Sequence, residues 1–149
     1  MRTKTASWFE TKIRYEKTMD DGLVKKLTEL YVVDAMSFTE AEAKITEVMK
    51  DYIAGEFEVQ AIKRAPFAEV LISEDEKDDR YFKGKLTFIT VDERTEKEVR
   101  SSGVFLVQAE NIDVARKYLK EEYENHAFDC ETVQISETKI IDVYERGKA

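Results

Sequence analysis

Aromatic and basic side chains share one face of each of two segments whose alternation is typical of half-buried strands. They are Trp8, Lys12 and Arg14 in the first segment and Tyr81, Lys83 and Lys85 in the second. An aromatic ring beside cations can stack on a base while the cations contact phosphates. The pattern therefore suggests a site for single-stranded nucleic acid or RNA, to which Lys63 and Arg64 could add.

A competing interpretation explains the same residues by packing alone. Trp8 and Tyr81 would lie between two parts of the protein, while the basic side chains cover apolar surface and pair with Glu10 or Glu16. The formal net charge of −8 favours this interpretation, because a polyanion is repelled at long range. Residues 1–26 nevertheless hold seven basic and four acidic side chains, a local balance of 7 − 4 = +3. A basic face on an acidic protein stays compatible with the sequence.

Residues that could catalyse a reaction or bind a metal are few. His126 and Cys130 lie four positions apart, but a zinc site needs three or four ligands and no others have suitable spacing. The acidic run at residues 74–79 lacks the glycine and the oxygen spacing of a calcium loop, so we expect a solvated hinge there. No phosphate loop, nucleophile elbow or zinc-protease motif occurs. The sequence therefore predicts no catalytic residue, no metal and no cofactor.

The segments that carry these residues occur twice in the chain. Trp8-Phe9-x-x-Lys12-Ile13 is matched at an offset of 73 by Tyr81-Phe82-x-x-Lys85-Leu86, and Ala41 and Ile45 are matched at an offset of 74 by Ala115 and Leu119. A repeat of this length indicates a duplicated supersecondary unit. We expect an α+β fold of two pseudo-symmetric ββαββ units, at residues 1–73 and 80–149, joined by an acidic hinge at residues 74–79. Each unit should hold an antiparallel sheet covered by one helix, and the two should form one compact domain.

Local signals predict the elements of each unit. In the first, strands at 8–17 and 23–36 flank an Asp20-Asp21-Gly22 turn, and a helix at 39–53 begins with Thr39 as its cap and Glu42 in a capping box. Pro66 separates strands at 56–64 and 67–73. In the second unit we expect strands at 80–92 and 97–109 around a turn near Glu93-Arg94-Thr95, a helix at 113–125 capped by Asp113, and strands at 129–137 and 139–145.

Composition indicates a globular protein rather than a membrane protein. No apolar run approaches the ~18 residues that span a bilayer, and the N-terminus lacks the apolar stretch of a signal peptide. Cys130 is the only cysteine, so an internal disulfide is impossible and a reducing cytoplasm is the expected location.

Two further motifs carry a resemblance over nearly the whole chain. They are Trp8-Phe9-Glu10-x-Lys12-x-Arg14-Tyr15 and Tyr31-Val32-Val33-Asp34-Ala35-x-Ser37-Phe38-Thr39-Glu40-Ala41. The chain resembles an uncharacterised family of Bacteroidetes and their phages, a domain of unknown function. This resemblance implies a bacterial or phage origin and carries no known activity. We therefore expect a non-enzymatic binding or adaptor protein that acts through a protein partner or as a homodimer, with single-stranded nucleic-acid binding as the alternative and no membrane contact.

Overall fold

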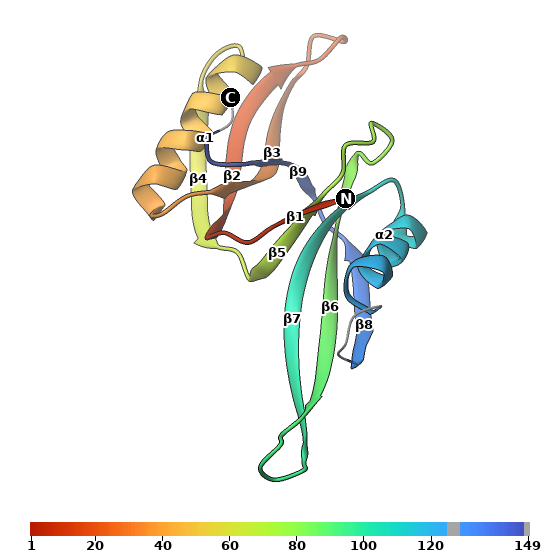
Figure 1. Ribbon diagram of the computed structural model, residues 1–149. Helices are drawn as coiled ribbons and strands as arrows, with labels where there is room; N and C mark the ends of the chain where they lie inside the picture. Colours follow the sequence, from red (N-terminus) through yellow and green to blue (C-terminus); the bar gives the residue numbers. More distant parts are fainter. Residues whose placement is uncertain (125–128, 148–149) are drawn as a thin grey trace. The chain divides into compact units, whose positions relative to one another are not determined.

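The computed structural model describes residues 1–124 and 129–147, which divide between two compact units. Unit 1 comprises Met1–Thr5 and Pro66–Thr138, and unit 2 comprises Ala6–Ala65 and Lys139–Ala149. Each unit contains one β-sheet with a helical segment on one of its faces (Figure 1). The predicted α+β class is confirmed.

Unit 2 has a four-stranded sheet in the order β4-β2-β3-β9. The strands are β2 (Trp8–Thr18), β3 (Val24–Asp34), β4 (Phe57–Arg64) and β9 (Ile140–Tyr144). Helix α1 (Phe38–Tyr52) covers one face, because Phe9 and Ile13 of β2 pack with Ala41, Ile45 and Met49 of the helix. The opposite face of β2 carries the even-numbered side chains, including Lys12 and Arg14.

Unit 1 has a five-stranded sheet in the order β1-β5-β7-β6-β8. The strands are β1 (Arg2–Lys4), β5 (Phe67–Ile72), β6 (Arg80–Val91), β7 (Glu98–Ala109) and β8 (Asp129–Glu137). Helix α2 (Ile112–Leu119) continues into a single π-helical turn, η1 (Lys120–Glu124). Phe82 and Leu86 of β6 pack with Ala115 and Leu119 of α2 to form the core.

The last strand of each predicted half lies in the sheet of the other half. Strand β5 pairs in parallel with β7, and β9 pairs in parallel with β3. The prediction of a wholly antiparallel sheet within each half is therefore wrong at these two strands. The predicted limits 1–73 and 80–149 do not coincide with the compact units either. Alternation along a strand reveals which face is buried, but it carries no information about the strand beside it.

The acidic segment at residues 74–79 is not a hinge between the units. It connects β5 to β6 within unit 1, and the chain passes between units after Thr5, Ala65 and Thr138 instead. Asp78 in this segment is buried, and its carboxylate accepts hydrogen bonds from the Ser73 hydroxyl and from the Tyr118 hydroxyl at 2.7 Å. The segment is therefore an anchored turn, which corrects the solvated hinge expected from its charge.

Both helices lie close to their predicted positions, but other residues cap them. Ser37 caps α1 by accepting a hydrogen bond from the Glu40 N–H at 3.1 Å, and the Glu40 carboxylate accepts one from the Met36 N–H at 3.2 Å. Asn111 caps α2 by accepting from the Val114 N–H at 2.9 Å. The predicted caps Thr39 and Asp113 are wrong by two residues, because several capping-competent side chains stand next to one another and only the backbone conformation selects among them.

Irregularities of strand pairing correspond between the two halves. The β2–β4 register shifts between Lys12 and Ile13, and the β6–β8 register shifts between Lys85 and Leu86, 73 residues later. The N–H of Ala65 donates to the Trp8 carbonyl at 2.9 Å, and at the same offset the N–H of Thr138 donates to the Tyr81 carbonyl at 2.9 Å. Within the described residues, no helix has the length and apolar character needed to cross a membrane.

Candidate functional site

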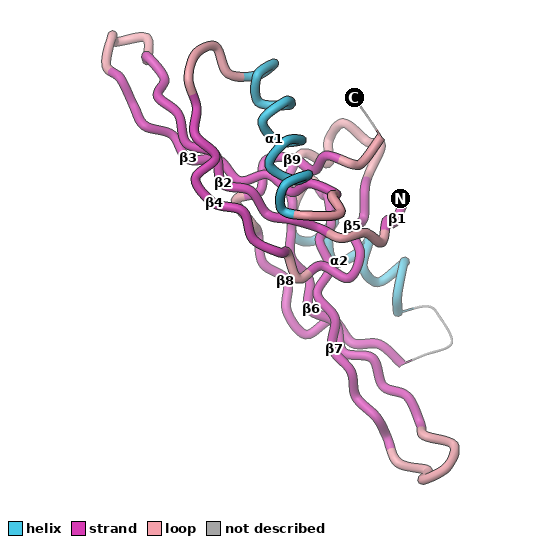
Figure 2. Tube along the Cα trace, turned by 90° about the vertical axis from the view of Figure 1, so that its left-hand side faces the viewer, coloured by secondary structure: helices cyan, strands magenta, loops and turns pink. Residues whose placement is uncertain are grey.

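Strands β2 and β3 extend beyond the strands that flank them. Strand β4 pairs with β2 only as far as Tyr15, and β9 pairs with β3 only from Leu30 onward. We call the hairpin formed by residues 16–29 the N-terminal arm; its turn closes one end of the β2–β3 pair in Figure 2. Gly22 has a φ of 82° in this turn, and the Asp21 carboxylate accepts a hydrogen bond from the Leu23 N–H at 3.0 Å. The predicted Asp-Gly turn is confirmed.

The arm has an open backbone edge along β3. Bonds at both ends of the β2–β3 ladder join odd-numbered residues, Ala35 N–H to the Ser7 carbonyl at 3.1 Å and Met19 N–H to the Leu23 carbonyl at 2.8 Å. Backbone groups point to alternate sides along a strand. The N–H and C=O groups of the even-numbered residues Val24, Lys26 and Thr28 therefore point away from β2. No strand of the described chain flanks β3 there, since β9 begins opposite Leu30.

Lysines concentrate on the arm beside this edge. Lys17 and Lys25 are directly opposite each other in the β2–β3 register, and like charges in that position destabilise a sheet. Lys26 follows on the other face of β3, and none of the three lysines forms an ion pair with a described residue. Leu23 and Val24 at the end of the arm are 63% and 59% exposed. The arm thus presents cations, apolar side chains and an open strand edge together.

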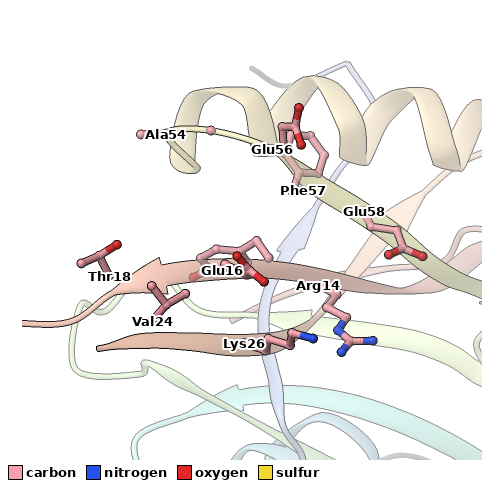
Figure 3. A pocket seen from close by; sticks show the side chains of 11 residues that line it. Arg14, Glu16, Thr18, Val24, Lys26, Ala54, Glu56, Phe57 and Glu58 are labelled. Carbon is pink, nitrogen blue, oxygen red and sulfur yellow. The ribbon is translucent and has the colours of Figure 1, made fainter. Parts of the chain in front are cut away.

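An open groove of about 750 Å³ lies at the base of the arm (Figure 3). The arm and its base contribute Arg14, Glu16 and Lys26, while residues 54–56 of the connection between α1 and β4 and residues 57–58 at the start of β4 line the other side. Arg14 lies opposite Glu58 in the register and Glu16 lies opposite Lys26, so acidic and basic groups alternate across the groove.

The apolar lining of the groove continues the unit 2 core. Tyr15 and Phe57 line the groove and also pack against the core beneath α1. Burial raises the pKa of Tyr15, and the nearby Glu29 carboxylate raises it further. The Tyr15 hydroxyl therefore stays protonated at neutral pH and is a hydrogen-bond donor rather than a base. Such a lining of rings and opposite charges suits a polypeptide segment that carries polar and apolar side chains.

The six residues predicted to bind nucleic acid do not form the expected site. The rings of Trp8 and Tyr81 are only 2% and 4% exposed, so neither offers a free face on which a base could stack. Lys12 and Arg14 belong to unit 2, whereas Lys83 and Lys85 belong to unit 1. Burial of the two rings removes the stacking platforms of this hypothesis and corrects it.

Neighbouring basic residues behave as the packing interpretation expects. Lys63 pairs with Glu10 at 3.8 Å. The Arg64 guanidinium lies over the Phe9 and Phe38 rings, 5.2 and 5.5 Å from their centroids. Sequence reasoning missed the arm, because it treated residues 23–36 as an ordinary second strand. The available signal was the Lys25-Lys26 pair, which begins three positions after Gly22 of the Asp-Gly turn.

The metal or nucleophile candidates remain unsupported. His126 lies outside the described residues. Burial raises the pKa of the Cys130 thiol, and Glu124 raises it further, so the thiolate that a nucleophile requires is disfavoured. Within residues 1–124 and 129–147, no three histidine, cysteine, aspartate or glutamate side chains are grouped in a way that could hold a metal ion.

Known proteins supply a family but no activity. No curated protein and no solved structure matches the chain. Residues 7–146 match the family described as "Domain of unknown function (DUF4494)", which covers nearly the whole chain and includes the arm and the groove. The protein belongs to this family.

Proposed function

We propose that this protein is a non-enzymatic binding or adaptor protein that engages a protein partner through the N-terminal arm and the groove at its base. The open edge of β3 at residues 24–29 is the observation that carries this proposal. An unflanked strand edge is a template for pairing with another chain, and proteins usually cover or blunt such edges. Here the edge ends in exposed Leu23 and Val24, which add apolar contact area.

The groove chemistry supports binding rather than turnover. Among the described residues its lining contains no serine, cysteine or histidine. Of its three carboxylates, Glu16 and Glu58 lie opposite the cations Lys26 and Arg14, while Glu56 has no opposed cation in the register. Neighbouring groups of opposite charge suit recognition of a partner's polar groups. The alternation of charge across the groove would select partner segments by electrostatic complementarity.

The proposal extends to the origin and history of the chain. We propose that the two ββαββ halves arose by duplication, which the register shifts at Lys12/Ile13 and Lys85/Leu86 support. Exchange of β5 and β9 between the sheets would then make each half depend on the other. A bacterial or phage origin is supported by the sequence resemblance, and a cytoplasmic location by the single cysteine.

Affinity purification with matched variants tests the proposed function. Three baits are compared. One is the wild type, and the arm variant carries Leu23→Asp and Val24→Asp. The control variant carries Val91→Asp and Val99→Asp on the other hairpin, where both residues are also exposed. We expect one protein to be retained by the wild type and the control but lost from the arm variant. The retained protein is then purified and its affinity measured by calorimetry. Equal retention by all three baits, or turnover of a small molecule by the isolated protein, would contradict the proposal.

A further inference from the structure

The open edge of β3 supports a more specific proposal, which rests on the proposed function. We propose that the partner adds an extended acidic segment as a new strand beside residues 24–29 of β3. The groups available for main-chain bonds are the N–H and C=O of Val24, Lys26 and Thr28. Peptides that bind by strand addition gain affinity from such bonds and specificity from side chains at alternate positions.

The geometry limits the length and position of the added strand. Strand β9 occupies the neighbouring row from Leu30 onward, so the partner lies in line with β9 and stops before it. The open stretch from Val24 to Glu29 accommodates about six extended residues at ~3.3 Å each. Val24, Lys25, Lys26 and Thr28 are all exposed, so their side chains leave the edge accessible.

The lysines specify an acidic partner segment. Lys25 and Lys26 are consecutive and project to opposite faces of β3, so two consecutive carboxylates on the added strand would each lie beside one lysine. A carboxylate beside Lys25 would also offset its unfavourable pairing with Lys17. Val24 favours an apolar, β-branched residue next to those carboxylates.

The other hairpin provides an internal control. Its β7 edge is also unflanked at residues 98–103, because β5 pairs with β7 only from Val104. Its cross-strand pairs, however, include Val91 with Glu98 and Ile89 with Arg100, and no like-charged pair. We therefore expect strand addition at β3 and not at β7. Lysines can also act as gatekeepers that merely prevent edge-to-edge pairing, and the experiment must separate the two roles.

Amide hydrogen exchange measured by NMR on the full-length, ¹⁵N-labelled protein gives a direct readout. The probe is a capped octapeptide with two central glutamates flanked by valine and threonine, and the control peptide carries lysines in place of the glutamates. With the acidic probe we expect the Val24, Lys26 and Thr28 amides to become protected. The Lys25 and Leu27 amides already face β2 and should change little. Uniform protection, or no protection, would overturn strand addition.

Charge variants test the specificity. Lys25→Glu with Lys26→Glu should weaken binding of the acidic peptide at least about five-fold, since each exposed pair contributes modestly, and Arg100→Glu should leave it unchanged. Binding should also weaken as salt rises. If the double variant instead self-associates and binds the peptide as well as the wild type does, the lysines are gatekeepers and the proposal is wrong. Tighter, lysine-dependent binding of a twelve-nucleotide uridine oligomer than of the acidic peptide would assign the edge to nucleic acid and also overturn it.

The outcomes also separate this proposal from the proposed function. If the natural partner depends on Leu23 and Val24 but produces no alternating protection in β3, strand addition is wrong while the binding function stands. If no protein is captured through the arm and no peptide binds, both proposals fail.

Discussion

The two sheets use corresponding central positions in different ways. Thr11 of β2 is buried and donates a hydrogen bond from its hydroxyl to the Tyr31 carbonyl at 3.0 Å. Gly84 of β6, 73 residues later, has no side chain, and a Cβ there would lie 2.6 Å from Cδ1 of Leu119. In unit 1 a helix side chain therefore occupies the volume above the strand, whereas in unit 2 the strand fills that position itself. The two sheets thus have corresponding strand orders, but the packing beneath each helix depends on which residue stands at the centre of the strand.

The two hairpins differ in a similar manner. The N-terminal arm carries the opposed pair Lys17 and Lys25 and has a glycine at the positive-φ position of its turn. The second hairpin, which we call the C-terminal arm and define as residues 90–103, has Glu96 at a φ of 57° and no opposed like charges. The opposed lysines therefore belong to one arm, whereas the unflanked strand edge and the exposed valines occur on both.

The largest expected effects concern the different packing at the sheet centres. Leu119→Ala should lower the free energy of unfolding by about 2–5 kcal/mol, because it removes a fully buried side chain and leaves a cavity. Gly84→Ala should cost about 1–3 kcal/mol by overpacking against Leu119. The double variant should cost less than the sum, since removal of the leucine makes room for the new methyl group. Urea denaturation measures all three variants, and strict additivity would show that the two residues do not share this volume.

The hydrogen bonds to Asp78 are expected to anchor the β5–β6 connection of unit 1. Asp78→Ala should lower the free energy of unfolding by about 1–3 kcal/mol, because the Ser73 and Tyr118 hydroxyls lose their buried acceptor. Glu76→Ala in the same segment is exposed and serves as the control, with an expected effect near zero. Equal effects of the two substitutions would show that the hydrogen bonds to Asp78 do not anchor this segment.

The same contact predicts a pH dependence at high pH. The hydrogen bond to Asp78, together with burial, raises the pKa of Tyr118 from 10.0 to about 12. A raised pKa in the folded state means that the stabilisation is complete below pH 10 and is lost as pH rises toward 12. Wild-type stability should therefore fall more steeply between pH 10 and 12 than that of Tyr118→Phe, as measured by urea denaturation at each pH. Parallel pH profiles would contradict the assignment.

The helix caps sharpen the comparison at the level of about 1 kcal/mol. Ser37→Ala and Asn111→Ala should each cost roughly that amount in unfolding free energy, because each removes an acceptor for an otherwise unpaired N–H. Glu40→Ala should add a similar cost in α1, where its carboxylate also lies 2.8 Å from Arg146. The corresponding third helical residue of α2 is Val114, so its truncation to alanine removes no capping bond. A Glu40→Ala variant as stable as the wild type would show that the contacts of the Glu40 carboxylate with the Met36 N–H and with Arg146 contribute nothing to the free energy of unfolding.

The smallest effects concern the arm turns. Glu96→Gly should stabilise the protein by about 0.5–1 kcal/mol, because glycine adopts a positive φ without the strain of a side chain. Gly22→Ala should destabilise by about 1 kcal/mol for the converse reason, although nothing lies within 4 Å of the added Cβ. Thermal unfolding measures both changes. Shifts of the same sign would show that φ does not account for the difference between the turns.

Much of the local structure followed from residue patterns. The Asp-Gly turn, the turn at residues 92–97 and the approximate positions of both helices depend on interactions within a few residues, and the structure confirms them. The candidate site was predicted less well. The pattern of Trp8 with Lys12 and Arg14 included one groove residue, Arg14, but it pointed to β2 rather than to the edge of β3 and could not show that the Trp8 ring is buried.

Apart from the short strand β1 and the helix caps, the sequence by itself determined which segments form strands, helices and turns and which face of each strand is apolar, because those choices depend on local conformation and on periodicity. Only the tertiary structure decided that β5 lies beside β7 and β9 beside β3, since any apolar strand can satisfy the same edge. The end points of those pairings then left residues 24–29 of β3 without a neighbour. The open edge of the arm is thus a consequence of long-range pairing: Lys25 and Lys26 mark a charged strand, but nothing in residues 24–29 shows where β9 stops.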